Sequence, residues 1–198
     1  MVNKKIILAS KSPRRKELLQ QFGLENFEVQ ESTYEEDMTL NKSPRELAEF
    51  LALQKAKDIA QQHKEAIVIG GDSIVFLGEN VYGKAGDRQE AIKMLQLFSG
   101  KKVGCVSGLA IIDVKNEKRI VTHGVGWLQF RKLSSEEIEK YVEKEDNILG
   151  VAGGFNIASK GIVLIDSVEG DFYSIVGLPM TKLYLGLKEL GIDILSFV

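Results

Sequence analysis

The sequence predicts an α/β protein built on a mixed β-sheet. In the first half of the chain, apolar strand-like segments alternate with helical patterns, which is typical of parallel strands joined by helices. In the middle, two β-rich segments at residues 101–113 and 119–130 are joined by a charged tip, which indicates a long antiparallel hairpin. A chain with both features requires a mixed sheet rather than a purely parallel one.

The first half is predicted to contain three strands and two helices. Apolar runs predict strands over residues 4–9, 27–30 and 66–77, the last buried on both faces. Ser12 followed by Pro13 starts a helix over residues 13–22, and a Ser-Pro-Arg-Glu capping box starts a second over 44–62. The polar and acidic segment 31–42 between them is predicted to be a loop.

The second half adds helices around the hairpin. Helical patterns cover residues 87–98, 134–144 and 179–190, and the glutamates near the second of these, including Glu145, are expected to face solvent. Strands are predicted over 162–166 and 172–176. The glycine-rich segment 149–161 has no clear pattern and is left without a prediction.

Composition limits the classes of function. The 198 residues carry a net charge of −2, so no overall basic surface exists to hold nucleic acid, which is not an expected partner. The single cysteine, Cys105, excludes an internal disulfide and fits a reducing compartment. No run approaches the ~20 apolar residues of a membrane span, and residues 1–9 are too short for a signal peptide. We therefore expect a soluble cytoplasmic protein without a membrane partner.

The first predicted helix begins with the cations Arg14, Arg15 and Lys16. A helix N-terminus carries unpaired N–H groups and a positive dipole, so cations are disfavoured there. Arg15 precedes Leu18 and Leu19 by three and four residues and shares their inward face. It is either an arginine at the edge of the core, paired to a carboxylate, or part of a phosphate site at a strand-to-helix turn.

Two further charged residues interrupt apolar patterns. Lys55 lies near the middle of the apolar face of the second helix, from which it either reaches the rim or enters a cleft and meets an anion. Asp72 lies inside an apolar strand after Gly70 and Gly71, which indicate a bulge or a close backbone approach. An aspartate paired to a lysine is one interpretation, but we favour a site carboxylate, because charges on core strands often mark function.

Other candidates are weaker taken singly. The acidic loop, with Glu31, Glu35, Glu36 and Asp37, is a solvated segment or the source of a magnesium ligand. Lys84 follows a glycine, while His63 and His123 have no neighbours at ligand spacing, and Cys105 fits a core position. Cations combined with few carboxylates suit a magnesium-bound polyphosphate. From the residues alone, the chain is expected to bind a phosphorylated ligand, and the residues leave open whether it hydrolyses that ligand.

The motifs LASKSPRRKELL, GGDSIV, GK and EGDFYSIVGLP occur in order between Leu8 and Leu190. In these motifs the chain resembles the Maf family of nucleotide pyrophosphatases. The resemblance implies a single domain over residues 1–198, two-lobed, with an elongated mixed sheet flanked by helices and a cleft between lobes, as in inosine triphosphate pyrophosphatases. It implies a metal-dependent hydrolase that converts a nucleoside triphosphate to the monophosphate and pyrophosphate, with magnesium or manganese, and it admits a homodimer.

The resemblance also implies roles for residues that match the family motifs. The residues for catalysis are Asp72, Lys55, Lys84 and Glu36. Those for substrate binding are Ser12, Arg14, Arg15, Ser73 and Ala158. The metal ligands are Glu36 and Asp72. In this scheme Asp72 is the general base and Arg15 is linked to substrate choice.

Three positions depart from the family motifs. Ser73 replaces a threonine and keeps the hydroxyl, and Ala85 replaces a proline. Ala158 stands where the family has a glutamine linked to base selection, and an alanine cannot hydrogen-bond a base edge. The usual preference for dTTP and UTP therefore stays open, with modified pyrimidine nucleotides and a role in nucleotide-pool sanitation among the expectations. Asn156 or Ser159 offers a compensating polar group.

Two alternatives to pyrophosphate release remain. The first is a non-catalytic nucleotide-binding regulator linked to septum formation, the process from which the family takes its name. The second is attack at the γ-phosphorus with release of orthophosphate.

Overall fold

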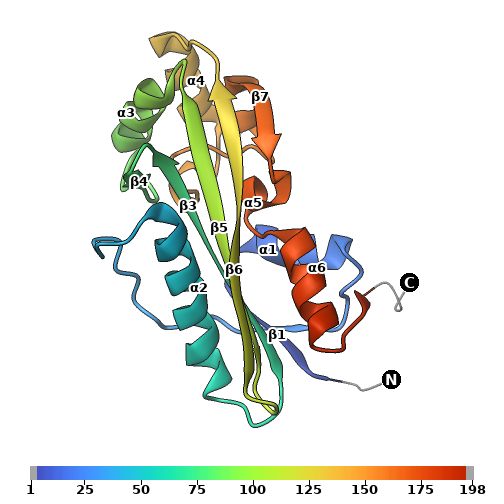
Figure 1. Cartoon of the computed structure of the whole chain (residues 1–198). Helices are drawn as coiled ribbons and strands as arrows, with labels where there is room; N and C mark the ends of the chain where they lie inside the picture. Colours follow the sequence, from blue (N-terminus) through green and yellow to red (C-terminus); the bar gives the residue numbers. More distant parts are fainter. Residues whose placement is uncertain (1–3, 195–198) are drawn as a thin grey trace.

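The computed structural model describes residues 4–194 and contains one seven-stranded sheet in the order β2-β1-β3-β5-β6-β7, with β4 paired to β3 (Figure 1). The strands are β1 (Ile6–Ala9), β2 (Glu28–Val29), β3 (Ile67–Leu77), β4 (Asn80–Tyr82), β5 (Lys102–Asp113), β6 (Lys118–Phe130) and β7 (Ile165–Gly170). The helices are α1 (Pro13–Gln21), α2 (Pro44–Ala60), α3 (Arg88–Phe98), α4 (Ser135–Lys144), α5 (Phe172–Val176) and α6 (Met180–Glu189), with 3₁₀ turns η1 (Ile148–Gly150) and η2 (Lys160–Leu164).

The sheet is mixed, as predicted. Strand β1 pairs in parallel with β2 and β3, whereas β3 with β5, β5 with β6, and β6 with β7 are antiparallel. The β5–β6 hairpin runs without a register shift from the Lys102–Gln129 pair to the Asp113–Lys118 pair. This hairpin forms the long axis of the molecule, so the expected elongated sheet flanked by helices is confirmed (Figure 1).

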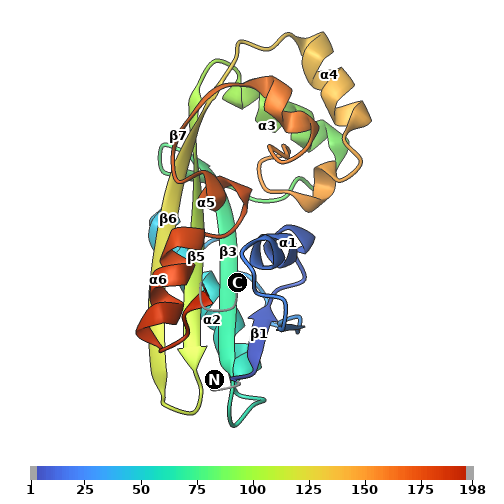
Figure 2. The same cartoon turned by 90° about the vertical axis from the view of Figure 1, so that its right-hand side faces the viewer.

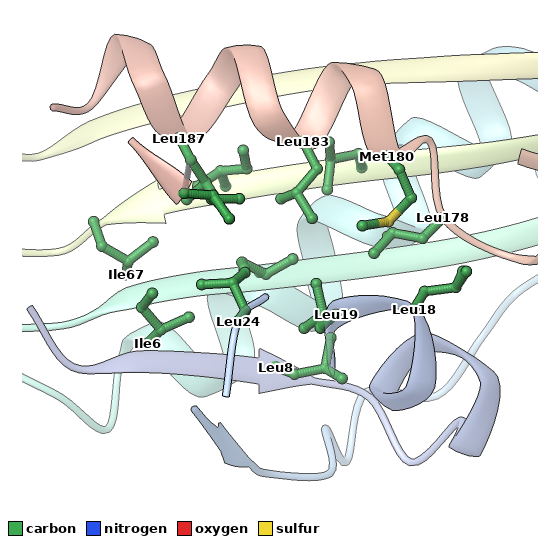
Figure 3. Close-up of a cluster of buried hydrophobic side chains, with 14 of the residues drawn as sticks. Ile6, Leu8, Leu18, Leu19, Leu24, Ile67, Leu178, Met180, Leu183 and Leu187 are labelled. Carbon is green, nitrogen blue, oxygen red and sulfur yellow. The ribbon is translucent and has the colours of Figure 1, made fainter. Parts of the chain in front are cut away.

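Helices cover both faces of the sheet at one end. On one face, α2 packs its alanines and Ile59 against Ile7, Val68 and Ala110. On the other face, α1 and α6 pack leucines against alternate residues of the same strands, among them Leu8 and Ile67 (Figure 3). Strand residues that alternate between the two faces are buried on both, which explains the continuous apolar run of β3.

A second core lies at the other end of the hairpin. There α3, α4 and the segment around Phe155 enclose an aromatic cluster with Phe98 and Phe130 at its centre. Figure 2 shows α3 and α4 above α1, on the same side of the sheet. The described residues thus form separate hydrophobic clusters on the two faces and at the two ends of one continuous sheet.

The Gly70 backbone lies in close contact with α2. A Cβ atom at Gly70 would lie 2.4 Å from the carbonyl oxygen of Ala52. Of the two interpretations of the paired glycines, the close approach is the one the structure has. Because this helix can lie so near β3, its side chains reach the strand residues that follow Gly70.

One edge of β3 is interrupted. Strand β1 pairs with β3 only as far as Gly70, and β4 begins to pair with it at Val75. Within the described part of the chain, residues 71–74 therefore have a strand neighbour on the β5 side alone. The gap leaves room for side chains and a ligand beside Asp72 and Ser73.

Three sequence expectations were wrong. Residues 172–176 form α5, not a strand, because Asp171 caps a short helix that ends at Gly177 with φ 140°. Strand β7 begins at Ile165, later than expected, because residues 160–164 form η2. Glu145 is buried just beyond α4, not exposed. None of the helices within residues 4–194 is both long and apolar enough to cross a membrane.

Candidate active site

A cavity of about 650 Å³ opens at the interrupted edge of β3. Its walls come from the start of α1, the loop after β2, the middle of α2 and β3, residues 83–84, residues 147–157 and residues 174–177. Eight charged side chains line it, five basic and three acidic: Lys11, Arg14, Arg15, Lys55, Lys84, Glu31, Glu36 and Asp72. The volume is in the range of small-molecule sites, and the lining has an excess of positive charge.

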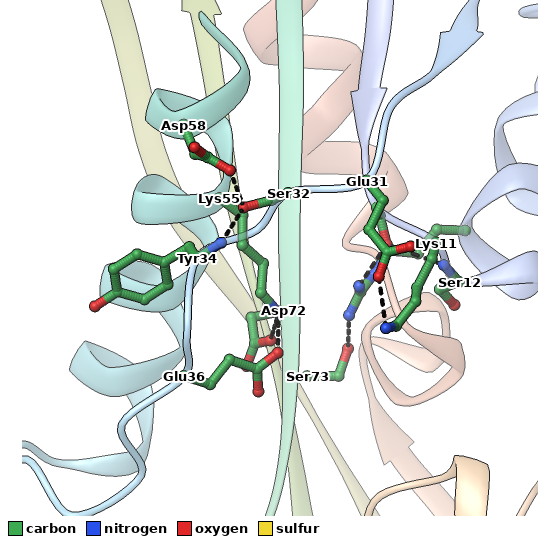
Figure 4. A network of polar contacts seen from close by, with 12 residues as sticks. Lys11, Ser12, Glu31, Ser32, Tyr34, Glu36, Lys55, Asp58, Asp72 and Ser73 are labelled. Carbon is green, nitrogen blue, oxygen red and sulfur yellow. Dashed lines mark hydrogen bonds and ion pairs between the residues drawn. The ribbon is translucent and has the colours of Figure 1, made fainter. Parts of the chain in front are cut away.

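On the α2 face of β3, one lysine bridges two carboxylates. The Lys55 Nζ atom lies 2.6 Å from Asp72 Oδ1 and 2.5 Å from Glu36 Oε1 (Figure 4). The Asp72 residue is only 6% exposed, and Lys55 is itself largely buried. Lys55 therefore enters the cleft and meets anions rather than reaching the rim, and the anions are protein carboxylates.

The two carboxylates differ electrostatically. Burial raises the pKa of Asp72, and the positive charges of Lys55 and Arg15 only partly oppose this effect. Burial also acts to raise the pKa of Glu36, but there the hydrogen bond and charge of Lys55, with the charge of Lys84, outweigh it and the pKa is lowered. Asp72 is thus the stronger base of the pair, and Glu36 the more firmly ionised.

On the α1 face of β3, Arg15 is held by neutral groups. Its Nε donates to the carbonyl oxygen of Gly177, Nη1 to Ser10 Oγ, and Nη2 to Ser73 Oγ, each at 2.9 Å. Arg15 is 9% exposed, and burial lowers its pKa. Within the described residues no carboxylate forms an ion pair with it. The core arginine paired to a carboxylate is therefore not what the structure has.

The position of Arg15 follows from helix geometry and from a serine network. Leu18 and Leu19 anchor α1 in the core, which turns Arg15 inward as the sequence predicts. Behind it, Ser73 Oγ lies 2.8 Å from Ser107 Oγ, and Ser107 donates to the Ser174 carbonyl oxygen. The guanidinium is consequently fixed before any ligand arrives.

The remaining predicted cations are held more loosely. Arg14 Nη1 donates to Asn156 Oδ1 at 3.3 Å, which links α1 to the opposite wall of the cavity. The Lys84 side chain is exposed, lines the cavity and forms no ion pair with a carboxylate of residues 4–194. Its backbone pairs with Ala152, so residues 83–84 and the glycine-rich segment are joined. Ser12 also lines the cavity, and its hydroxyl does not cap α1.

The glycine-rich segment presents Asn156 to the cavity instead of Ala158. Ala158 and Ser159 are exposed and do not line the cavity, whereas Asn156 and Ile157 do. The Asn156 backbone N–H donates to the Tyr141 hydroxyl at 2.9 Å, and burial raises the pKa of Tyr141 to about 12. The structure therefore brings all the sequence-predicted site residues except Ala158 to the cavity.

Several contributing residues were not predicted. Ser10 and Gly177 accept hydrogen bonds from Arg15, Ser107 contacts the Ser73 hydroxyl that does the same, and Asp58 holds the loop that carries Glu36. Ser10 and Gly177 fall inside the quoted motifs, which was a signal for them. Ser107 lies in an ordinary apolar strand pattern and Asp58 on an ordinary polar helix face, so neither was visible in the sequence.

The donor set fits a magnesium ion. Within the described residues, no group of three or more histidine, cysteine, aspartate or glutamate side chains is arranged to hold a metal. Glu36 and Asp72, however, both contact one Nζ atom, so their oxygens converge on one point. Magnesium is commonly bound by one or two carboxylates together with substrate phosphates, and two carboxylates in one cavity match that requirement in number and type.

Comparison with known proteins identifies the family. The Maf family model, described as Maf-like protein, matches residues 5–190. The chain belongs to the Maf family. Relatives named dTTP/UTP pyrophosphatase are 42% identical in Desulforamulus reducens, 40% in Methanococcoides burtonii and 41% in Bacillus cereus strain G9842. The alignments cover 96% of this chain in each case, and 98%, 97% and 98% of the respective relative.

The Maf motifs of the sequence meet at the cavity. Residues from the SPRR block, the GGDSIV strand, the GK pair and the SIVG part of the last block all contribute to its lining. A crystal structure of protein VC0702 from Vibrio cholerae matches over 72% of this chain and 71% of that one, at 16% identity and a TM-score of 0.34.

Proposed function

We propose that this chain is a nucleoside triphosphate pyrophosphatase that hydrolyses its substrate to the monophosphate and pyrophosphate. The observation that carries the proposal is the set of cations Arg14, Arg15 and Lys84, which face the cavity without a carboxylate partner in the described residues. Burying a charge such as that of Arg15 is costly unless an anion offsets it. A triphosphate supplies that anion, and relatives named dTTP/UTP pyrophosphatase support the choice.

In the proposed mechanism, cations bind the phosphate chain. Arg15 presents a fixed guanidinium, Arg14 contacts the chain from the start of α1, and the first N–H groups of that helix add donors. Lys84 and Lys55 stabilise the negative charge that develops on the phosphate oxygens and on the leaving pyrophosphate. Positioning and electrostatics supply most of the acceleration, as in other phosphoryl transfers.

Asp72 acts on the attacking water. Its raised pKa makes this carboxylate a better base than an exposed aspartate, and its contact with Lys55 fixes its orientation. The carboxylate takes a proton from water as the oxygen forms a bond to the α-phosphorus. The bond from that phosphorus to the bridging oxygen of pyrophosphate breaks in the same step, which leaves the monophosphate.

Glu36 and Asp72 are the residues that would hold a magnesium or manganese ion. When bound, such an ion neutralises charge on the phosphate oxygens and helps orient the triphosphate. Glu36 is suited to this role because its lowered pKa keeps it ionised across the neutral range.

The test is product analysis over a panel of nucleoside triphosphates, beginning with dTTP, UTP and modified pyrimidine nucleotides. Pyrophosphate and orthophosphate are measured separately, with magnesium, with manganese and with a chelator. Metal-dependent pyrophosphate with an equal amount of monophosphate is the expected result. Orthophosphate with a diphosphate product would indicate attack at the γ-phosphorus. Tight binding without any product would instead favour the regulator linked to septum formation.

Base selection is a separate readout of the same panel. Ala158 is exposed outside the cavity, and Asn156 on the cavity wall is the nearest replacement for a missing amide. We expect weaker discrimination between bases than a site with an additional hydrogen-bonding amide would give, because polar contacts produce the strongest discrimination.

A further inference from the structure

Lys55 and its two partners, Glu36 and Asp72, form a cluster whose members do not all lie on regular secondary structure. Lys55 lies on α2 and Asp72 on β3, both regular elements in the core. Glu36 lies in the segment between β2 and α2, which contains no helix or strand. Its place beside Lys55 therefore depends on what fixes this segment.

A single carboxylate oxygen of Asp58 fixes the start of the segment. Asp58 Oδ2 accepts hydrogen bonds from Ser32 Oγ at 2.8 Å, Thr33 N at 2.7 Å and Thr33 Oγ1 at 3.3 Å. Ser32 Oγ in turn accepts from the Tyr34 backbone N–H at 3.1 Å (Figure 4). Three consecutive residues are thereby tied to one side chain of α2.

Asp58 follows Lys55 by three residues on α2, so the two side chains project from the same face of the helix. Glu36 follows Tyr34 by only two residues, a span of at most about 7 Å. Only a short stretch of backbone therefore separates the residues bound by Asp58 from Glu36, which contacts Lys55 at 2.5 Å. A shift of the anchor is expected to move the Glu36 backbone.

The hydrogen bonds that Asp58 accepts from Ser32 and Thr33 have an ionised acceptor. The hydrogen bonds from Ser32 and Thr33 lower the pKa of Asp58, so the group is ionised at neutral pH. Hydrogen bonds to an ionised acceptor are shorter and stronger than neutral ones. Further along the loop, Tyr34 and Met38 pack against a cluster around Leu47 and Leu51. Asp58 thus supplies the polar attachment nearest Glu36 on its N-terminal side.

We propose that Asp58 is a positioning residue of this active site, which holds residues 32–34 on α2 so that Glu36 faces Lys55 and Asp72. The inference rests on the proposed function, since Glu36 matters only if the cluster performs hydrolysis. It also makes a structural claim that needs no activity to be tested.

The first experiment compares three variants of the full chain. Asp58→Ala removes the acceptor while keeping a strong helix former. Asp58→Asn keeps one acceptor oxygen, and all three donors use a single oxygen. Glu49→Ala is the matched control, because it removes a half-buried carboxylate of α2 whose partner is His123 on β6 and not a residue of segment 31–42.

Asp58→Ala is expected to lower kcat for pyrophosphate release by about tenfold to a hundredfold, the scale of a misplacement near 1 Å. The KM for the nucleotide should change less than about threefold, because the cations that bind phosphate are untouched. Asp58→Asn and Glu49→Ala should stay within about threefold of the wild type in kcat. If Asp58 had only a structural role, Asp58→Ala would lower the melting temperature but leave kcat per folded molecule unchanged. That result would overturn the proposal.

The second experiment measures backbone hydrogen exchange without nucleotide or metal. In Asp58→Ala the Thr33 amide loses its acceptor and the Tyr34 amide loses a fixed one, so peptides over residues 31–38 should exchange faster. Glu49→Ala should leave these peptides unchanged. Equal exchange in Asp58→Ala and wild type would overturn the proposal, whether or not the protein proves to be an enzyme.

The third experiment asks whether Asp58 acts through Glu36. If it does, the double variant Asp58→Ala with Glu36→Gln should be no slower than Glu36→Gln alone. Multiplied losses, or a Glu36→Gln variant with wild-type kcat, would contradict the proposal. Absence of turnover in the wild type would remove the proposed function, and the hydrogen exchange result would then decide the anchoring claim by itself.

Discussion

The two faces of β3 treat a buried cation differently at neighbouring positions. On the α2 face, Lys55 contacts two carboxylates, Glu36 and Asp72. On the α1 face, Arg15 contacts two serine hydroxyls and a carbonyl oxygen, with no carboxylate ion pair within residues 4–194. Asp72 and Ser73 are adjacent in a strand, so their side chains point to opposite faces and separate the two environments.

The difference indicates that the α2 face and the α1 face of β3 have different roles. The charge of Lys55 is offset by the carboxylates of Glu36 and Asp72, so it does not need the negative charge of the substrate. The charge of Arg15 is offset by no such group, which leaves it available to a phosphate. Its donors are held by groups that stay neutral, so its orientation persists when the ligand leaves. We therefore expect changes on the α2 face to affect chemistry and changes on the α1 face to affect binding.

The largest expected effect is that of Asp72→Asn. The amide keeps the shape but cannot take a proton, so kcat for pyrophosphate release should fall about a thousandfold or more, while nucleotide binding stays within a few-fold. Turnover assays and titration calorimetry with a non-hydrolysable analogue measure the two parts. Near-normal turnover would remove Asp72 from the chemistry.

The same variant has a predicted effect on stability. The pKa of Asp72 is raised in the folded state, so the folded protein binds this proton more tightly than the unfolded chain does. The resulting contribution to the free energy of unfolding is fully present below the unfolded-state pKa of 3.8, and it is lost as pH rises through the folded-state pKa. The ionised carboxylate thus costs stability at neutral pH, and Asp72→Asn should raise Tm there by a few degrees. The gain should vanish near pH 4. A lower Tm at pH 7 would show that the ion pair with Lys55 dominates instead.

Arg15→Lys comes next and tests the α1 face. A lysine cannot reproduce the three-way fork to Ser10, Ser73 and Gly177, so the KM for the nucleotide should rise about tenfold to a hundredfold with a smaller change in kcat. Arg14→Lys is the matched comparison, with less than about fivefold expected, because Arg14 makes one long bond to Asn156. If Arg15→Lys leaves KM unchanged, the phosphate chain binds elsewhere.

Lys55→Gln tests the α2 face through the pH dependence of turnover. Lys55 is the largest of the charges that oppose the raised pKa of Asp72, so its removal should raise that pKa further. The acid limb of the kcat/KM profile should then move to higher pH by about one unit, on top of a lower maximum. A limb that stays in place would assign it to a group other than Asp72.

Sequence reasoning predicted the mixed sheet and the charged residues that the structure brings to the cavity, but not every element around them. Arg15, Lys55 and Asp72 each broke a strong local pattern, and a charge in an apolar period is visible without knowledge of the tertiary structure. The mixed sheet was likewise predictable, since the hairpin of β5 and β6 has a continuous β pattern. Helix α5 was missed because an aromatic and β-branched run resembles a strand, and its Asp171 cap outweighs that propensity.

The contacts between elements were beyond local reasoning. Arg15 donates to Ser10, which follows β1, and to Ser73 of β3, which Ser107 of β5 contacts in turn, and no periodicity connects these serines. The gap in the edge of β3 arises from where β1 ends and β4 begins, which depends on pairing rather than on either strand alone. Ala158 shows the limit of motif transfer: its place in the motif was clear, but the loop turns it away from the cavity.

Ser107→Ala is expected to have the smallest effect on activity and so to sharpen the contrast between scaffold and site. Ser107 is fully buried, donates to the Ser174 carbonyl oxygen and contacts Ser73 Oγ, but does not line the cavity. Its loss leaves a buried carbonyl unpaired, at a cost of about 1–3 kcal/mol, and Tm should fall by about 2–4 °C per kcal/mol. The kcat/KM should stay within about threefold, because Arg15 keeps all three of its acceptors. A tenfold loss of kcat/KM with an unchanged Tm would mean that the serine network tunes the guanidinium during binding, and the α1 face would then be more than a rigid support.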